Sequence, residues 1–165
     1  MKKDIKVIFL DVDGVMTDGK IIYNEKGEET KHFNVHDGLG IKLAMRAGLE
    51  IIIISGRKSV VTDIRAAELG IKAYTGIADK AALYRQIRDE KGYEDCDCAA
   101  IGDDINDIGM LRSVGTSATV ADAPEYVKSE ADYITFAKGG EGAVREFIEY
   151  ILKKCGIWED VLRSY

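Results

Sequence analysis

Short apolar runs recur along the chain, and stretches with helical spacing of apolar residues separate them. The runs are residues 5–10, 51–54, 99–101 and 119–121, with weaker ones at 72–74 and 133–135. They do not alternate with polar residues, as expected of strands that are buried on both faces of a parallel sheet. Helices are expected over residues 38–47, 58–69, 80–91 and 143–154, and the last has the clearest amphipathic stripe. This alternation predicts an α/β fold with a doubly wound, Rossmann-like parallel sheet.

One segment interrupts the alternation directly after the first strand. Residues 20–23 and 29–33 have strand character, and the residues between them, which include Gly27, have the composition of a turn. We therefore expect a β-hairpin flap over residues 20–33, which is too small to be a cap domain. The 165 residues predict a single domain over 1–165. The tail 156–165, with Trp158 and Tyr165, is apolar for a terminus, and we expect it to dock on its own body or on a neighbouring subunit.

The overall composition excludes several classes of partner. A net charge of −6 argues against broad nucleic-acid binding, which needs a basic surface. No apolar run approaches the ~20 residues of a membrane-spanning helix, and Met1–Asp4 lead into the first strand without the profile of a signal peptide. The odd number of cysteines, Cys96, Cys98 and Cys155, indicates reduced thiols. We expect a cytoplasmic protein with no nucleic-acid and no membrane partner.

Aspartates follow two of the expected strands. Asp11 and Asp13 come directly after the first strand, where two carboxylates about 4 Å apart would repel by ~4 kcal/mol at an effective dielectric of ~20. A capping turn is one interpretation of this pair, and a Mg²⁺ site is the other. Asp103, Asp104 and Asp107 follow the strand at 99–101, although capping the next helix needs only one acid. Because ligands bind at the carboxyl ends of parallel strands, a metal site that joins Asp11 and Asp103 is favoured.

Two further strand ends carry groups suited to phosphate. Ser55 and Gly56 precede an expected helix start, which can present backbone N–H groups to an anion. A plain helix cap is the alternative there. Lys80 opens a helix, an unfavourable place for a cation unless its ammonium group points at clustered carboxylates. The alternative for Lys80 is an ordinary solvated lysine.

In chain order, four segments resemble the four motifs of the haloacid dehalogenase superfamily. They are Asp11-x-Asp13-Gly14-Val15-x-Thr17, Ser55, Lys80 and Gly102-Asp103-Asp104-x-x-Asp107. The resemblance implies phosphoryl transfer through an aspartyl-phosphate, with Asp11 as nucleophile and Asp13 as general acid and base. It also implies that Lys80 and Ser55 hold the phosphoryl oxygens, and that Mg²⁺ is bound by Asp11, the backbone carbonyl of Asp13 and Asp103. Asp104 and Asp107 would then tune Lys80 or the surroundings of the metal.

No gap between these motifs is long enough for a large cap, so the chain resembles the capless branch of that superfamily. Within that branch it resembles the phosphatases of phosphorylated sugar acids, over residues 11–19, 33–38, 55–59, 79–80, 102–104, 121–123 and 139–146. That resemblance implies a homotetramer, in which hairpins associate into a barrel and a neighbour's tail closes each site, and a role in lipopolysaccharide precursor synthesis. Arg57 favours an octulosonate 8-phosphate over a 2-keto-3-deoxynononate or acylneuraminate 9-phosphate, because phosphatases of the latter tend to carry Glu there. A non-catalytic oligomerisation module is a further alternative. We expect Arg57 and Arg65, eight residues apart, to lie near one helix face. The implied substrate-binding residues are Asp13, Asn34, Val35, His36, Asp37, Gly38, Lys42, Arg57, Arg65 and Lys80.

Overall fold

The computed structural model describes residues 5–164. Met1–Asp4 and the terminal Tyr165 lie outside the described residues, and so do the expectations made for them. A six-stranded, all-parallel sheet forms the centre of the fold, in the order β5-β4-β1-β6-β7-β8. Its strands are β1 (Val7–Leu10), β4 (Glu50–Ile54), β5 (Lys72–Tyr74), β6 (Cys98–Ile101), β7 (Thr116–Thr119) and β8 (Tyr133–Ile134).

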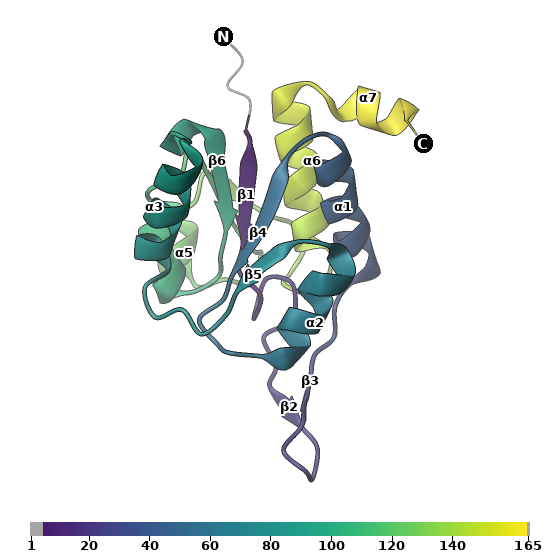
Figure 1. Cartoon of the computed structure of the whole chain (residues 1–165), viewed down its shortest axis with the longest axis vertical. Helices are drawn as coiled ribbons and strands as arrows, with labels where there is room; N and C mark the ends of the chain where they lie inside the picture. The colour runs from purple at the N-terminus through teal and green to yellow at the C-terminus, as the bar shows by residue number, and fades with distance from the viewer. Residues whose placement is uncertain (1–4, 165) are drawn as a thin grey trace.

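Helices cover both faces of the sheet, so the predicted doubly wound α/β fold is confirmed (Figure 1). One face carries α1 (Val35–Arg46), α2 (Val60–Leu69) and α6 (Ala143–Cys155), and α1 packs extensively on α6. The other face carries α3 (Lys80–Lys91) and α5 (Glu125–Lys128), with α4 (Ile108–Leu111) packed against α3. Short 3₁₀ turns span Asp95–Asp97 and Ile105–Asp107. The described helices include none long and apolar enough to cross a membrane.

The sheet register sets the height at which each strand ends. Leu10, the last residue of β1, lies opposite Ile53 of β4 and Ile101 of β6. The strands β1, β4 and β6 therefore end within about one residue of each other, and the side chains that follow them lie at the same edge of the sheet. β1 is completely buried, as its unbroken Val-Ile-Phe-Leu sequence predicts.

The expected hairpin is confirmed and consists of β2 (Ile22–Tyr23) and β3 (Glu29–Thr30), which pair antiparallel. It projects from the edge of the sheet at which β1 ends (Figure 1). Asn24 closes the turn: its carbonyl accepts from the N–H of Gly27 at 2.9 Å, and its side chain accepts from Lys26 and Glu28. Among the described residues between β1 and α1, the hairpin is the only regular structure, so no cap domain is inserted there.

Some expected boundaries are wrong, and each has a local cause. α1 begins at Val35 rather than Gly38 because the side chain of Asn34 accepts the N–H of His36 at 2.8 Å and caps the helix. α2 begins at Val60 rather than Lys58 because Ser59 is its N-cap. β7 covers Thr116–Thr119 and not residues 119–121. Its hydroxyl side chains are buried but bonded, for example Thr119 to the carbonyl of Gly102 at 2.7 Å, so this strand lacks an apolar signal.

The C-terminal tail forms a helix that the sequence did not indicate, α7 (Trp158–Arg163). It docks on α6 of its own chain, with Trp158 packed against the core and Val161 buried. The cationic groups of Arg145 and Lys153 lie 5.9 and 5.4 Å from the Trp158 ring. The sequence left open whether this tail docks on its own body or on a neighbouring subunit, and in the described residues it docks on its own body.

Candidate active site

A buried lysine lies between two buried aspartates at the carboxyl edge of the sheet. Nζ of Lys80, the first residue of α3, is 2.7 Å from Oδ1 of Asp11 and 2.7 Å from Oδ1 of Asp107. The side chain of Lys80 is 1% exposed. The sequence offered a solvated lysine as an alternative, and the structure excludes it. Asp79, which caps α3 by accepting from the N–H of Ala82, fixes where Lys80 enters the site.

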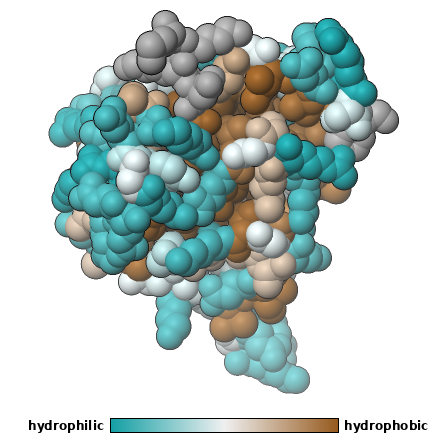
Figure 2. All heavy atoms as spheres, turned by 45° about the horizontal axis from the view of Figure 1, so that its top comes forward, coloured by the Kyte–Doolittle hydropathy of each residue, from teal (hydrophilic) through white to brown (hydrophobic). Residues whose placement is uncertain are grey.

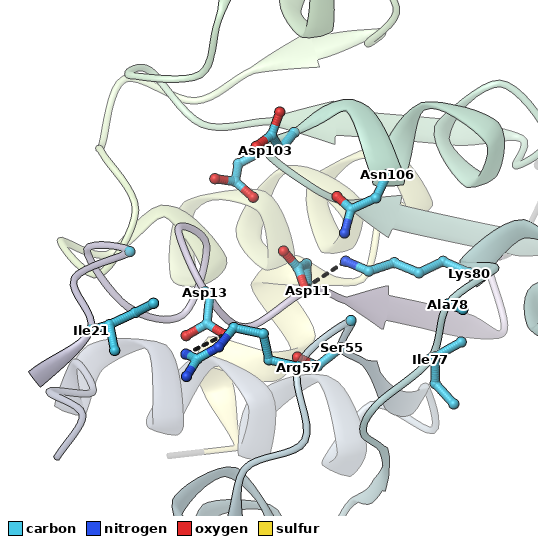
Figure 3. A pocket seen from close by; sticks show the side chains of 13 residues that line it. Asp11, Asp13, Ile21, Ser55, Arg57, Ile77, Ala78, Lys80, Asp103 and Asn106 are labelled. Atoms are coloured by element: carbon cyan, nitrogen blue, oxygen red, sulfur yellow. Dashed lines mark hydrogen bonds and ion pairs between the residues drawn. The ribbon is translucent and has the colours of Figure 1, made fainter. Parts of the chain in front are cut away.

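Asp103 completes a cluster of three carboxylates. One oxygen each from Asp11, Asp103 and Asp107 lies within 4.8 Å of the other two, so the predicted meeting of Asp11 and Asp103 is confirmed. Asp107 also accepts the backbone N–H groups of Asp103 and Asp104 at 3.0 and 3.2 Å. These bonds fold the loop after β6 back on itself, so that Asp103 faces Asp11 (Figure 3).

The charges in this cluster are not balanced by the protein alone. Burial and the neighbouring Asp107 raise the pKa of Asp11, and Lys80 only partly offsets them. Burial, followed by repulsion from Asp11 and Asp107, raises the pKa of Asp103. Burial alone would lower the pKa of Lys80, but the two carboxylates that it contacts raise it above its ordinary value. One lysine thus faces three acids, and this excess of negative charge favours a bound cation.

The residues fit Mg²⁺ in particular. The ion prefers carboxylate and other oxygen ligands, and one oxygen of each of these carboxylates lies within 4.8 Å of the other two. Asp107 is already engaged by Lys80 and two backbone N–H groups, which leaves Asp11 and Asp103 as the side chains with capacity for the ion. Gly14, with φ +88°, is needed here because any Cβ would overlap the carboxylate of Asp103.

Asp13 lies beside this cluster and is held by cations from other parts of the chain. One of its oxygens contacts Nζ of Lys31, from the segment after β3, and the other lies 3.5 Å from Nη1 of Arg57. Thr17 shapes the loop between Asp13 and the hairpin, because its hydroxyl accepts the N–H groups of Gly14 and Gly19 at 3.3 and 3.2 Å. Asp13 consequently has a fixed place at the cavity wall.

A cavity of about 500 Å³ opens over these groups (Figure 3). Ser55 is 1% exposed overall, and its backbone is fixed by bonds to Tyr74 and Ile77. The wall brings together Asp11, Asp13, Ser55, Arg57, Lys80, Asp103 and Asp104, with Gly19, Ile21, Gly56, Ile77, Ala78 and Asn106. Every residue predicted to act on phosphate or metal therefore lines one cavity.

The residues expected to bind the sugar are divided. Arg57 lines the cavity, but Asn34–Gly38, Lys42 and Arg65 do not. Nζ of Lys42 donates to the carbonyl of Leu69 at 2.6 Å, and the guanidinium of Arg65 lies 5.6 Å from the Phe33 ring. Asp37 is buried and accepts the N–H of Arg145, and burial raises its pKa to about 6. The expectation that Arg57 and Arg65 share a helix face is wrong, because Arg57 precedes α2.

The sequence did not single out three polar residues in or beside the site. Asn106 lines the cavity and stands within the acidic segment that was recognised, so its position after β6 was a usable signal. Lys31 and Glu29 reach Asp13 and Arg57 from the hairpin. Nothing in their local sequence distinguishes them from solvated hairpin charges.

A parallel sheet with an aspartate pair after β1 and a lysine and acid cluster at the neighbouring strand ends defines a haloacid dehalogenase-like hydrolase. In agreement, the model of a family described as haloacid dehalogenase-like hydrolase matches residues 75–148. Whole-chain comparisons narrow this class. The 3-deoxy-D-manno-octulosonate 8-phosphate phosphatase of Haemophilus influenzae is 41% identical over 93% of this chain and 86% of its own. That of Escherichia coli K12 is 40% identical over 91% of this chain and 80% of its own.

Solved structures agree with this result. The crystal structure of 3-deoxy-D-manno-octulosonate 8-phosphate phosphatase from Moraxella catarrhalis, in complex with magnesium ion, phosphate ion and KDO, has a TM-score of 0.95 and 41% identity. The match covers 99% of this chain and 94% of that one. The cobalt-bound enzyme from Haemophilus influenzae has a TM-score of 0.90 and 40% identity, over 94% and 92% of the two chains. The chain belongs to the family of 3-deoxy-D-manno-octulosonate 8-phosphate phosphatases.

Proposed function

We propose that this chain hydrolyses 3-deoxy-D-manno-octulosonate 8-phosphate to 3-deoxy-D-manno-octulosonate and phosphate, with Mg²⁺ as cofactor. The observation that carries the proposal is the placement of Lys80, 2.7 Å from Asp11, beside Asp103 and within the same cavity as Asp13 and Ser55. A non-catalytic module would gain nothing from burying three aspartates and a lysine, because such a cluster costs stability unless a ligand compensates it. The likeness to the family's phosphatases supports the same reading.

Each site residue has a role in this proposal. An oxygen of Asp11 attacks phosphorus and forms an aspartyl-phosphate, while the bond to the sugar oxygen breaks. Asp13 delivers a proton to the departing alkoxide and then takes one from the water that hydrolyses the acyl phosphate. Lys80 and Ser55 hold the phosphoryl oxygens as charge develops on them. Asp107 orients Lys80 through their 2.7 Å contact.

Mg²⁺ would be held by Asp11, Asp103 and the backbone carbonyl of Asp13. When bound, it neutralises phosphoryl charge and polarises the phosphorus–oxygen bonds. Asp104 accepts from the Tyr126 hydroxyl at 3.1 Å and from the N–H of Ile105 at 2.7 Å. It would therefore shape the loop around the ion rather than bind it.

The choice of sugar acid depends on Arg57. This residue lines the cavity and stands where phosphatases of the nonulosonate 9-phosphates tend to carry Glu, and the named relatives act on the octulosonate 8-phosphate. A 2-keto-3-deoxynononate or acylneuraminate 9-phosphate is the alternative substrate. Asn34–Gly38, Lys42 and Arg65 lie outside the cavity of one chain, so their part in sugar binding would require an assembly that brings them to a site.

We infer a homotetramer as that assembly. Apolar side chains on and beside the hairpin are left exposed in the single chain, namely Ile21, Ile22, Tyr23, Val60 and Ile64. In the space-filling view, apolar atoms reach the surface directly above the hydrophilic hairpin tip (Figure 2). Hairpins that associate would cover such a surface.

We place the enzyme in the cytoplasm, and the free thiols of Cys96, Cys98 and Cys155 support this location. Its proposed reaction would belong to lipopolysaccharide precursor synthesis.

A phosphate-release assay tests the proposal. Purified protein with Mg²⁺ should release phosphate from the octulosonate 8-phosphate faster than from the nonulosonate 9-phosphates, and chelation of the metal should stop the reaction. Asp11→Asn should abolish turnover, because its amide oxygen cannot form the acyl phosphate. The variant should remain folded. Full activity of Asp11→Asn would eliminate the assigned nucleophile. A stable, fully active monomer in sedimentation would refute the tetramer.

A further inference from the structure

Lys31 contacts Asp13 from the hairpin and lies outside the motifs identified in the sequence. Its side chain is 1% exposed, although it belongs to a segment that projects from the body. Asp13 and Lys31 are 18 residues apart, so this contact exists only when the hairpin folds back on the loop after β1. A lysine buried in this way loses hydration, and only a specific charge partner compensates that loss.

The contact belongs to a closed group of four charges. Lys31 and Arg57 each reach both Asp13 and Glu29: Nζ of Lys31 lies 3.4 Å from Glu29, and Nη2 of Arg57 lies 2.9 Å from Glu29. Two cations are thus balanced by two carboxylates. Because Glu29 contacts both Lys31 and Arg57, its carboxylate offsets the second positive charge beside Asp13.

The same group is tied to the body of the protein. Glu29 accepts from the hydroxyl of Ser59, the N-cap of α2, at 2.5 Å. Arg57 also donates to the hydroxyl of Tyr23, on the other strand of the hairpin, at 3.3 Å. The hairpin is therefore docked through polar contacts of Tyr23, Glu29 and Lys31, and Lys31 is its direct link to Asp13. The side chain of Asp13 remains 21% exposed, on the wall of the cavity.

We propose that Lys31 is a positioning residue, which holds the carboxyl group of Asp13 where it can protonate the departing sugar oxygen. This inference rests on the proposed function and adds a residue to it. Lys31 is too buried to touch the substrate while the hairpin is docked. Arg57 cannot replace it, because the side chain of Arg57 is 34% exposed and its Nη1 lies 3.5 Å from Asp13.

The step that depends on Lys31 is the first half of the reaction. An oxygen of Asp11 bonds to phosphorus as the phosphorus–oxygen bond to the sugar breaks, and the electron pair of that bond stays on the sugar oxygen. Asp13 takes up a proton from water before this step and passes it to this oxygen, so the product leaves as an alcohol and Asp13 returns to the carboxylate that Lys31 and Arg57 contact. An alkoxide is strongly basic and needs that proton, whereas p-nitrophenolate is weakly basic and leaves without one. Misplacing Asp13 should therefore slow only the sugar phosphate.

The test compares kcat/KM for the octulosonate 8-phosphate and for p-nitrophenyl phosphate at saturating Mg²⁺. The value of kcat/KM reports the steps up to the departure of the leaving group, so the later hydrolysis of the acyl phosphate does not affect it. General acid catalysis is worth ~10²–10⁴-fold, so we expect Lys31→Met to lose roughly 10–100-fold on the sugar phosphate and less than about 3-fold on the aryl phosphate. Lys31→Arg, which keeps the charge, should recover most of the loss.

Lys91→Met is the matched control, because it removes a lysine from a 2.8 Å pair with Glu50 on the opposite edge of the sheet. It should leave both kcat/KM values unchanged. Glu29→Gln, a milder change should Lys31→Met fail to fold, should give a smaller loss with the same selectivity. Equal losses on both substrates, or no loss on either, in a folded variant would overturn the inference alone. A wild-type chain that cleaves neither substrate would remove the proposed function and this inference together.

Discussion

Replacing Lys80 by methionine tests whether the buried charge cluster is as interdependent as its geometry indicates. Methionine fills a similar volume but leaves Asp11 and Asp107 without the cation that lies 2.7 Å from each. Their side chains are 7% and 0% exposed, so water cannot take the place of the ammonium group. Removing one partner of a buried pair typically costs ~3–5 kcal/mol. For a chain of this size, that corresponds to a fall of roughly 6–20 °C in Tm.

The pH dependence of this loss follows from the sign of the shift at Asp11. Burial and Asp107 raise the pKa of Asp11 to about 6, and Lys80 opposes that rise. Without Lys80 the pKa rises further. A carboxyl group whose pKa is raised on folding stabilises the folded state below its unfolded pKa, and this contribution is lost as the pH rises through the folded value. The destabilisation by Lys80→Met should therefore be larger at pH 8 than at pH 5.

Urea unfolding without Mg²⁺, at one fixed protomer concentration, measures these differences. Lys91→Met, which breaks a more exposed pair with Glu50, should cost less than about 1 kcal/mol. Lys80→Met combined with Asp107→Asn should cost less than the sum of the two single changes, because the double variant no longer buries an uncompensated Asp107. A Lys80→Met variant within 1 kcal/mol of wild type, or strict additivity in the double variant, would refute the reasoning.

Three further experiments probe the metal site and the loop after β8. Gly14→Ala should abolish Mg²⁺-dependent activity, because a Cβ would displace Asp103. Gly27→Ala is the control: Gly27 has a similar positive φ and nothing near its Cβ, so this change should cost only the backbone strain of ~1–2 kcal/mol. Equal loss of activity in both variants would contradict the role assigned to Gly14. Mg²⁺ should raise Tm more at pH 8 than at pH 5, since burial and Asp11 raise the pKa of Asp103 and the ion must displace a proton at the lower pH; equal shifts would argue against Asp103 as a ligand. Glu146 accepts hydrogen bonds from the Tyr133 hydroxyl and from the N–H groups of Phe136 and Ala137 at 2.8–2.9 Å. Glu146→Ala should therefore lower the free energy of unfolding by about 1–3 kcal/mol and speed hydrogen exchange at Phe136 and Ala137. Unchanged exchange would show that other contacts hold this loop.

The parts of the site that the sequence predicts depend on strand ends. Leu10, Ile53 and Ile101 lie opposite one another, so the residues after β1 and β6 had to meet wherever the parallel sheet formed. Lys80 was predictable for a different reason: a cation at a helix start is unfavourable unless an acid receives it. By contrast, β7 was misplaced because its buried Thr and Ser side chains find partners that a hydropathy pattern does not show.

The group around Asp13 was beyond the sequence because it depends on where the hairpin folds. Arg57 and Asp13 are 44 residues apart, and Ser59 and Glu29 are 30 apart. Each of these residues has a sufficient local explanation: Ser59 caps a helix, and the hairpin charges look solvated. Such explanations compete with functional ones until the tertiary structure decides between them. In a fold without a cap domain, the wall of the cavity has to come from loops and from the hairpin. The hairpin also brings Lys31 to Asp13, and disrupting it should affect the acid step before it affects the metal.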